Sequence, residues 1–166
     1  MSAALDNKSY EIVLHDPDHV KGIAFNMVFM IWRRHTTAAA YQHGMKVVRQ
    51  LASTHPTGVG VCHVVETDAI PPDAAARAVF VDFLRMREVQ HFSVTHEGSG
   101  FKAATVRAIV AGVHAFARPT FPHSVHSRVG DAARWHASIQ EKLGRKEPGA
   151  HIESIAQALR HFHRET

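Results

Sequence analysis

Hydrophobic and polar positions along this chain follow two periods in turn, and the changes between them predict strands followed by helices. Residues 59–65 form a continuous apolar run bounded by turn residues, which is typical of a strand buried on both faces. Residues 89–95 predict a second strand. Apolar positions recur at helical spacing over residues 73–87 and 101–117, which predicts two amphipathic helices. This alternation indicates parallel strands joined by right-handed helical crossovers.

The segment before these strands and helices, residues 20–33, has apolar residues at both its odd and its even positions. Residues 20–33 predict either one long strand or two strands with a bend near Asn26, since periodicity does not separate the two. A helix is predicted to follow, capped by Thr36 or Thr37 and ending near Ser53. A strand at a solvated sheet edge does not need two apolar faces. Either helices cover both sides, or this segment pairs with another chain as in a homodimer; it is also where a hydrophobic pocket is expected.

The two ends of the chain complete the predicted fold. Residues 10–14 and 123–128 predict short strands, and residues 131–143 predict a further helix. No helix separates the first strands, so they are expected to be antiparallel. We therefore expect a single α/β domain whose mixed sheet has four or five strands. Its start is antiparallel and its core parallel, with about four helices and an add-on helix at the C-terminus.

Three parts are predicted along the chain. Residues 1–9 are expected to be a flexible N-terminus, residues 10–146 the α/β domain, and residues 147–166 a linker with a short amphipathic helix. That last helix is expected either to dock on the core or to be free to dock on a partner. Its apolar stripe consists of Ile152, Ile155, Ala156, Leu159 and Phe162.

Composition narrows the class of protein. The 166 residues are 45% hydrophobic and 20% charged, which suits a packed core and argues against disorder. The single cysteine excludes a disulfide framework and favours a reducing compartment. No signal peptide is apparent and no apolar stretch is long enough to span a membrane, so a cytoplasmic location is expected. The net charge of +4 is spread among acidic residues, so nucleic acid is not an expected partner.

The order of these elements resembles the STAS fold of anti-sigma-factor antagonists. The resemblance covers about residues 10–143. It is carried by residues 58–65 as the central strand and by residues 129–143 as the terminal helix. It is a resemblance of topology and pattern, and it implies a STAS-like regulatory domain.

In antagonists of that family, a partner kinase phosphorylates a serine that follows the central strand and starts the next helix. The corresponding loop here is residues 66–72, which lacks the family's Asp-Ser-Ser-Gly pattern and has Thr67 as its only hydroxyl. Ser99 belongs to the next unit of the chain. Thr67 and Ser99 are the two candidate phosphorylation sites.

A candidate interaction edge follows from the parallel order of the strands. Loops that leave parallel strands emerge at one edge of the sheet, where ligands of such folds usually bind. The residues expected at this edge are Glu66, Thr67, Asp68, Glu97, Gly98, Ser99, Gly100 and Lys102.

Two interpretations of the Gly-Ser-Gly turn remain open. Backbone N–H groups at the start of a helix, together with the Lys102 ammonium, suit a phosphate or a carboxylate of a partner. Alternatively, Gly98 and Gly100 only serve a tight turn while Ser99 caps the helix. A single Gly-Ser-Gly lacks the longer spacing of a nucleotide-binding loop.

The fifteen histidines match no metal-binding spacing, so neither a metal nor another cofactor is expected. His63, in the apolar strand beside Cys62, is expected to be a buried imidazole bonded to backbone. Because neighbouring strand residues face opposite sides, these two do not form a catalytic pair. No catalytic residue is assigned.

The expected function is that of a non-enzymatic regulatory or scaffolding module that acts through protein–protein contacts, as a homo-oligomer or with another protein. One alternative is a binding protein for a phosphorylated or lipid-like small molecule at the same edge. A second alternative is a small serine hydrolase built on Ser99, His96 and either Glu66 or Asp68, although no Gly-x-Ser-x-Gly elbow is present.

Overall fold

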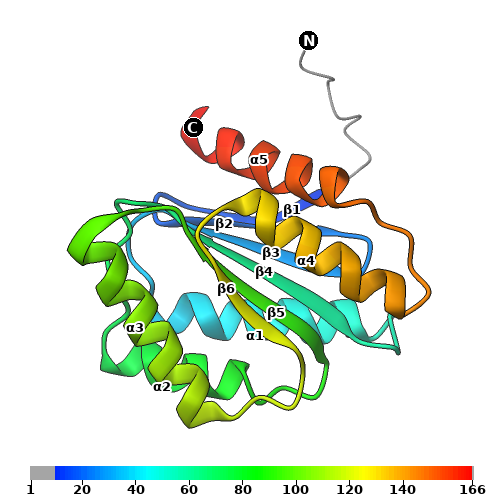
Figure 1. The fold of residues 1–166 in the computed structure, drawn as a ribbon, viewed down its shortest axis with the longest axis horizontal. Helices are drawn as coiled ribbons and strands as arrows, with labels where there is room; N and C mark the ends of the chain where they lie inside the picture. The colour runs from blue at the N-terminus through cyan, green and yellow to red at the C-terminus, as the bar shows by residue number, and fades with distance from the viewer. Residues whose placement is uncertain (1–9, 166) are drawn as a thin grey trace.

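A computed structural model describes residues 10–165 of the chain; the prediction for residues 1–9 lies outside this range. The described residues form one mixed sheet between two layers of helices (Figure 1). The strands are β1 (Glu11–His15), β2 (His19–Ala24), β3 (Met27–Trp32), β4 (Val59–Val65), β5 (Val89–His96) and β6 (His123–His126). The helices are α1 (Ala38–Ala52), α2 (Ala74–Phe83), α3 (Gly100–Ala117), α4 (Val129–Lys142) and α5 (Gly149–Glu165).

The strands lie in the sheet in the order of the chain, from β1 to β6. The pairs β1–β2 and β2–β3 are antiparallel, and the pairs β3–β4, β4–β5 and β5–β6 are parallel. The predicted α/β class, antiparallel start and parallel core are therefore confirmed. The predicted number of strands is wrong, because the sheet has six strands rather than four or five.

The turn between β2 and β3 decides how residues 20–33 are arranged. They form two antiparallel strands joined at Phe25 and Asn26, with Ala24 paired to Met27. Asn26 is fully buried, and its Oδ1 accepts a hydrogen bond of 2.7 Å from Nε2 of Gln140 in α4. The turn of the hairpin is thus held by a residue 114 positions away along the chain. The hydrophobic pattern of residues 20–33 gives no indication of this contact.

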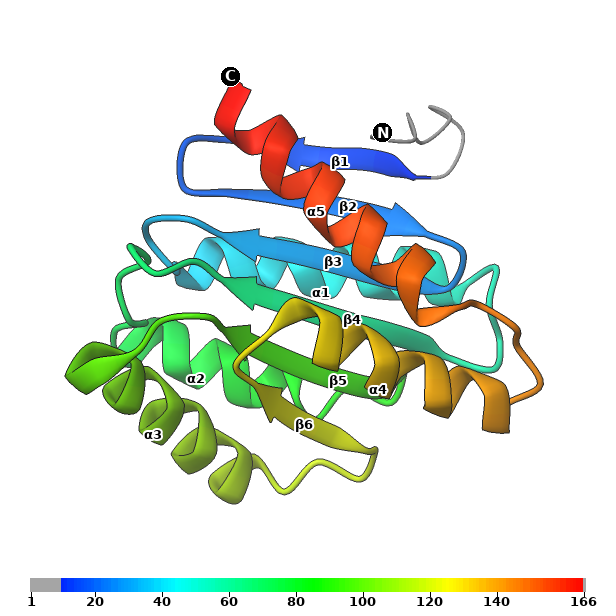
Figure 2. The same ribbon diagram turned by 45° about the horizontal axis from the view of Figure 1, so that its top comes forward.

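Helices cover both faces of the sheet. The three crossover helices α1, α2 and α3 lie on one face, while α4 and α5 cover the other (Figures 1 and 2). Each face of the sheet has its own hydrophobic core. In β3, Met30 and Trp32 belong to the core under α1, α2 and α3, and Phe29 and Ile31 belong to the core under α4 and α5. This explains why the segment is apolar on both alternations. β2 and β3 lie inside the sheet, so they offer no edge to another chain; the edge strands are β1 and β6.

The C-terminal helix α5 is docked on the core rather than free. It buries Ile152, Ile155 and Leu159 against β2 and β3. Burying one such side chain contributes about 1.5–3 kcal/mol. An added Cβ at Gly22 of β2 would lie 2.8 Å from a methyl carbon of Leu159, so the glycine permits this close approach.

Two helices begin at a capping side chain, of which Thr37 was one of the two predicted candidates and Asp73 was not predicted as a cap. The Thr37 hydroxyl accepts a hydrogen bond from the N–H of Ala40, and the Asp73 carboxylate accepts one from the N–H of Ala76. α2 ends at Phe83, before the predicted residue 87, because the chain tightens there into i to i+3 turns. Within residues 10–165, no helix has the length and apolar character needed to cross a membrane.

Candidate functional site

One end of the sheet gathers the loops that the sequence singled out. β2 begins there and the parallel strands end there, since His19 pairs with Trp32, Trp32 with Val65, and Val65 with His96. The loops after β4 and β5 therefore leave the sheet side by side. We call this end the carboxyl edge; it comprises residues 15–19, 33–37, 66–73, 97–102 and 127–128.

The eight residues predicted for this edge differ in exposure. Glu66 is buried, and Glu97 and Gly98 are half-buried. The exposed members are Thr67, Asp68, Ser99, Gly100 and Lys102. The two glutamates therefore face the protein, and the remaining polar groups face solvent.

Arg160 of α5 joins the two central loops of the carboxyl edge. Its Nε lies 3.3 Å from Oε1 of Glu66, and its Nη1 lies 2.8 Å from Oε2 of Glu97. One guanidinium thus pairs with both carboxylates, which leaves one net negative charge among the three side chains, and it ties α5 to the loops after β4 and β5. The sequence analysis missed Arg160, because nothing in the periodicity of α5 indicates that its polar side reaches this edge.

Ser99 occupies the N-cap position of α3 but does not cap the helix. Its backbone is extended, as at other helix starts, yet its side chain accepts no hydrogen bond from the first turn. Ser99 is therefore the N-cap residue by position, but the prediction that its hydroxyl caps the helix is wrong. Within the described part of the chain, the first N–H groups of α3 have no side-chain acceptor.

The residues of the hydrolase alternative are not aligned for catalysis. His96 is buried, and its Nδ1 accepts a hydrogen bond from the N–H of Gly98 rather than bonding Ser99. Glu66 is paired with Arg160. The proposed line from serine to histidine to carboxylate is absent among residues 10–165.

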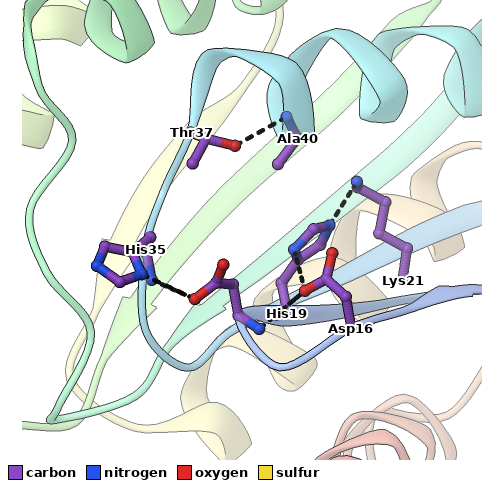
Figure 3. A network of polar contacts seen from close by, with 7 residues as sticks. Asp16, His19, Lys21, His35, Thr37 and Ala40 are labelled. Carbon is purple, nitrogen blue, oxygen red and sulfur yellow. Dashed lines mark hydrogen bonds and ion pairs between the residues drawn. The ribbon is translucent and has the colours of Figure 1, made fainter.

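A second polar cluster lies at the same end of the sheet, on the face covered by α1 (Figure 3). Nζ of Lys21 lies 2.8 Å from Nε2 of His19, whose Nδ1 lies 3.1 Å from a carboxylate oxygen of Asp16. The geometry at Nδ1 is too poor for a hydrogen bond. Lys21 and His19 were not singled out by the sequence analysis, because a lysine within a strand is ordinarily solvated.

Burial dominates the protonation of this cluster. Lys21 is fully buried, and burial lowers the pKa of its ammonium to about 8. Burial, followed by the charge of Lys21, lowers the pKa of His19 to about 4. At pH 7, a neutral His19 accepts a hydrogen bond from a charged Lys21. Because both side chains are enclosed, they hold the start of β2 in place but cannot reach a substrate in this structure.

The acidic residues beside this cluster stabilise turns. Asp16 accepts hydrogen bonds from the N–H groups of Asp18 and His19. Asp18 accepts one of 2.9 Å from His35, which lies after β3. The hydrogen bond from His35 is the main reason why the pKa of Asp18 is lowered.

Another buried cluster lies beneath α4, on the opposite face. Nδ1 of His136 lies 2.7 Å from Nδ1 of His91, and its Nε2 lies 2.7 Å from the hydroxyl of Ser93. Burial raises the pKa of the neighbouring Cys62 to about 12, so this residue remains a thiol. All four side chains are enclosed, so the cluster links strands to α4 and is not an open site.

His63 differs from its predicted environment. It is buried as expected, but its ring contacts side chains rather than backbone: Nε1 of Trp32 donates to Nδ1 over 3.4 Å, and Nε2 lies 3.0 Å from Sδ of Met30. His63 also lines a cavity of about 20 Å³ beneath the loop at residues 70–72. The cavity has room for about one water and not for a lipid chain. None of residues 20–32 lines it, so that segment does not form the expected hydrophobic pocket here.

No protein-family model, curated protein or solved structure matches this chain. The STAS-like resemblance therefore stays a prediction. Among residues 10–165, no three His, Cys, Asp or Glu side chains come together as metal ligands.

Two large apolar side chains are exposed at the carboxyl edge. Ile70, in the loop after β4, is 49% exposed, and Phe101, in the first turn of α3, is 90% exposed. The other large exposed apolar side chains of the described chain are Phe116 and Leu143, which lie away from this edge. Neither Ile70 nor Phe101 was predicted as a site residue. Both lie where a loop meets a strand or helix, outside the apolar faces that pack on the sheet, and this position could have indicated that they are exposed.

Proposed function

We propose that this chain is a non-enzymatic binding module that contacts another protein through the carboxyl edge. The observation that carries the proposal is the exposure of Ile70, in the loop after β4, and of Phe101, in the first turn of the helix that follows the neighbouring strand β5. Protein interfaces use such aromatic and aliphatic side chains as anchors within a polar rim. Here the rim would consist of Thr67, Asp68 and Lys102.

The loop that holds Ile70 is fixed before any partner binds. The N–H of Ile70 donates to the carbonyl of Arg34 over 2.6 Å, and its own carbonyl accepts a hydrogen bond of 2.8 Å from the hydroxyl of Thr36. Arg160 holds the start of the same loop through Glu66. A preorganised loop loses little conformational entropy on binding, which favours a contact surface.

Phosphorylation provides a route for regulating this surface. Thr67 and Ser99 are both exposed hydroxyl residues within it. A phosphate on either would add about 1.5–2 negative charges beside the apolar anchors. We propose that modification of either residue changes the affinity for the partner.

The proposal is tested with Phe101→Ser, which removes an almost fully exposed anchor, and with Ile70→Ser, which removes the second one. The matched control is Phe116→Ser, at the other end of α3. Phe116 lines a different apolar groove of about 480 Å³ between α2 and α3. Partners are captured with each variant from cells that produce the chain and quantified by mass spectrometry. Self-association is measured in parallel by light scattering.

A partner of the carboxyl edge should be lost about tenfold or more with Phe101→Ser, because a buried aromatic anchor contributes about 2 kcal/mol or more. The same partner should be retained by Phe116→Ser. If Phe116→Ser alone abolishes capture, the groove between α2 and α3 is the contact surface and the proposal is wrong. If neither variant changes any association, the carboxyl edge is not a protein contact.

A further inference from the structure

The outward face of α3 is apolar, unlike that of α1. α1 exposes mainly polar side chains, as a helix at a protein surface ordinarily does: Gln42, Lys46, Arg49 and Gln50. Beyond Lys102, the exposed residues of α3 are only alanine, glycine and phenylalanine: Ala104, Ala108, Ala111, Gly112, Ala115 and Phe116. A helix that is apolar on every side is typically buried on every side. The outward face of α3 is therefore expected to be covered.

α2 lies beside α3 and extends this face (Figure 1). Small side chains of both helices, among them Ala78, Ala108 and Gly112, line an open groove of about 480 Å³ between them. A Cβ added at Gly112 would meet no atom of the described chain within 4 Å. Phe116 lines the same groove and is 71% exposed. We call this surface the α2–α3 face; it consists of Ala74, Ala78, Ala104, Ala108, Ala111, Gly112, Ala115 and Phe116.

The α2–α3 face is complementary to itself. In a twofold dimer the same patch of both copies forms the contact, so a projecting side chain must meet a groove of the same patch. A twofold axis perpendicular to α3 sets the two copies of this helix antiparallel, with opposite ends of their dipoles adjacent. With the axis midway between Ala108 and Gly112, these two residues lie opposite each other in the two copies. Phe116 then lies opposite Ala104, where only a methyl group occupies the surface.

The size of the α2–α3 face matches a small protein interface. α3 has 18 residues and α2 has 10, so the helices are about 27 Å and 15 Å long, and each is about 10–12 Å wide. The face thus measures about 400–500 Å² on each copy, or about 800–1,000 Å² in a pair. Interfaces of this size are at the low end of specific contacts, where association is weak and reversible.

The charges around the face do not favour a charged partner. Arg77 is the single charged residue that lines the groove. It is exposed, and its Nη1 donates to the carbonyl of Pro72 over 2.9 Å, so it can stay solvated at the rim. The guanidinium of Arg85 already lies over the ring of Phe116, 5.7 Å from its centroid. The partner that fits is another apolar face of similar size and shape, and a second copy of the chain supplies one.

We propose that the α2–α3 face is the contact surface of a weak, reversible homodimer in which the two α3 helices pack antiparallel. This inference does not rest on the function proposed for the carboxyl edge. In the antiparallel arrangement, residue 101 lies beyond the C-terminal end of the partner copy's α3. Phe101 therefore stays accessible at the carboxyl edge, and each proposal can fail without the other.

The first test is sedimentation equilibrium of the whole protein over a range of concentrations. We expect a monomer–dimer equilibrium with a dissociation constant between about 10 μM and 1 mM. A protein that stays monomeric up to about 1 mM would overturn the proposal. So would capture of a different protein that depends on Gly112 while the chain itself stays monomeric.

Matched variants locate the contact. Gly112→Glu and Ala108→Glu change exposed positions, so the fold should be kept, as thermal unfolding checks. Each places two facing carboxylates in the apolar contact and should weaken dimerisation at least about 100-fold. Ala150→Glu adds the same charge at an exposed position of α5, on the other side of the sheet (Figure 2), and should leave dimerisation unchanged. Equal effects of Gly112→Glu and Ala150→Glu would place the contact elsewhere.

The aromatic residues separate this contact from the carboxyl edge. Phe116→Ser should weaken dimerisation about tenfold, whereas Phe101→Ser should not change it. In a mixture of isotope-labelled and unlabelled protein, filtered NMR should show NOEs from the ring of Phe116 in one copy to the methyl group of Ala104 in the other. NOEs between the copies that join other elements would contradict the antiparallel arrangement.

Discussion

Lys21 is a fully buried ammonium whose single hydrogen-bond partner in the described chain is His19. Its pKa of about 8 means that keeping it charged in the folded protein at pH 7 costs roughly 3 kcal/mol relative to water. A methionine of similar length would fill the same space without that cost.

We therefore expect Lys21→Met to raise the free energy of unfolding at pH 7 by about 1–3 kcal/mol. The folded pKa of Lys21 lies below its unfolded value near 10.5, so the wild type regains this stability as the pH rises above 8. The difference between the two proteins should shrink towards pH 10. Urea unfolding at pH 7 and pH 9.5 measures it, and a variant less stable than the wild type at pH 7 would contradict the argument.

For single residues, burial and position in the fold could be predicted better than the side chains that they contact. The sequence indicated that His63 is buried, but not that Trp32 and Met30 are its partners. It placed Glu66 and Glu97 at one edge, but not the arginine that pairs with both. Side-chain partners depend on which residues meet in space, and local pattern does not carry that information.

Among the helices, α1 and α3 both begin at a residue with a hydroxyl, Thr37 and Ser99, but only the first hydroxyl caps its helix. Thr37 accepts a hydrogen bond of 3.2 Å from the first turn of α1, while Ser99 accepts none from α3. We expect Thr37→Ala to lower the free energy of unfolding by about 1 kcal/mol and Ser99→Ala by only a few tenths. Thermal unfolding of both variants measures this, and equal losses would show that Ser99 does cap its helix in solution.

Among the elements, those with a clear period were predicted closely. The strand at Val59–Val65 and the helix at Gly100–Ala117 agree with prediction to within a residue at each end. Residues 20–33 were ambiguous, because a strand and a tight hairpin have the same two-residue period. The turn at Asn26 is set by its buried contact with α4.

The whole molecule contains many histidines that are buried in the neutral form. Burial lowers the pKa of His63 to about 3 and those of His91 and His114 to about 4, and the pKa of His136 lies well below its usual range. In the unfolded chain each would have a pKa near 6.5. The unfolded state therefore binds protons first as the pH falls.

We expect stability to fall steeply between pH 6.5 and pH 4. Each such histidine contributes about 1.4 kcal/mol of loss per pH unit, so several together exceed a typical folding free energy of about 5–15 kcal/mol. Urea unfolding at pH 7.5, 6.5 and 5.5 tests this. His114→Phe should reduce the slope by about one proton, whereas the exposed control His161→Gln should not. A stability independent of pH over this range would show that the rings are hydrated or paired in solution.

By itself, the sequence determined the α/β class, the antiparallel start and parallel core of the sheet, and the edge at which the loops after β4 and β5 gather. These follow from periods of two and of 3.6 residues and from turn residues, all of which are local. Only the tertiary structure decided that Arg160 joins Glu66 to Glu97, that Thr37 caps its helix while Ser99 does not, and that Phe101 is exposed. Such features depend on which segments, distant along the chain, lie against each other in space. The hydrophobic pattern of a single sequence does not indicate which segments these are.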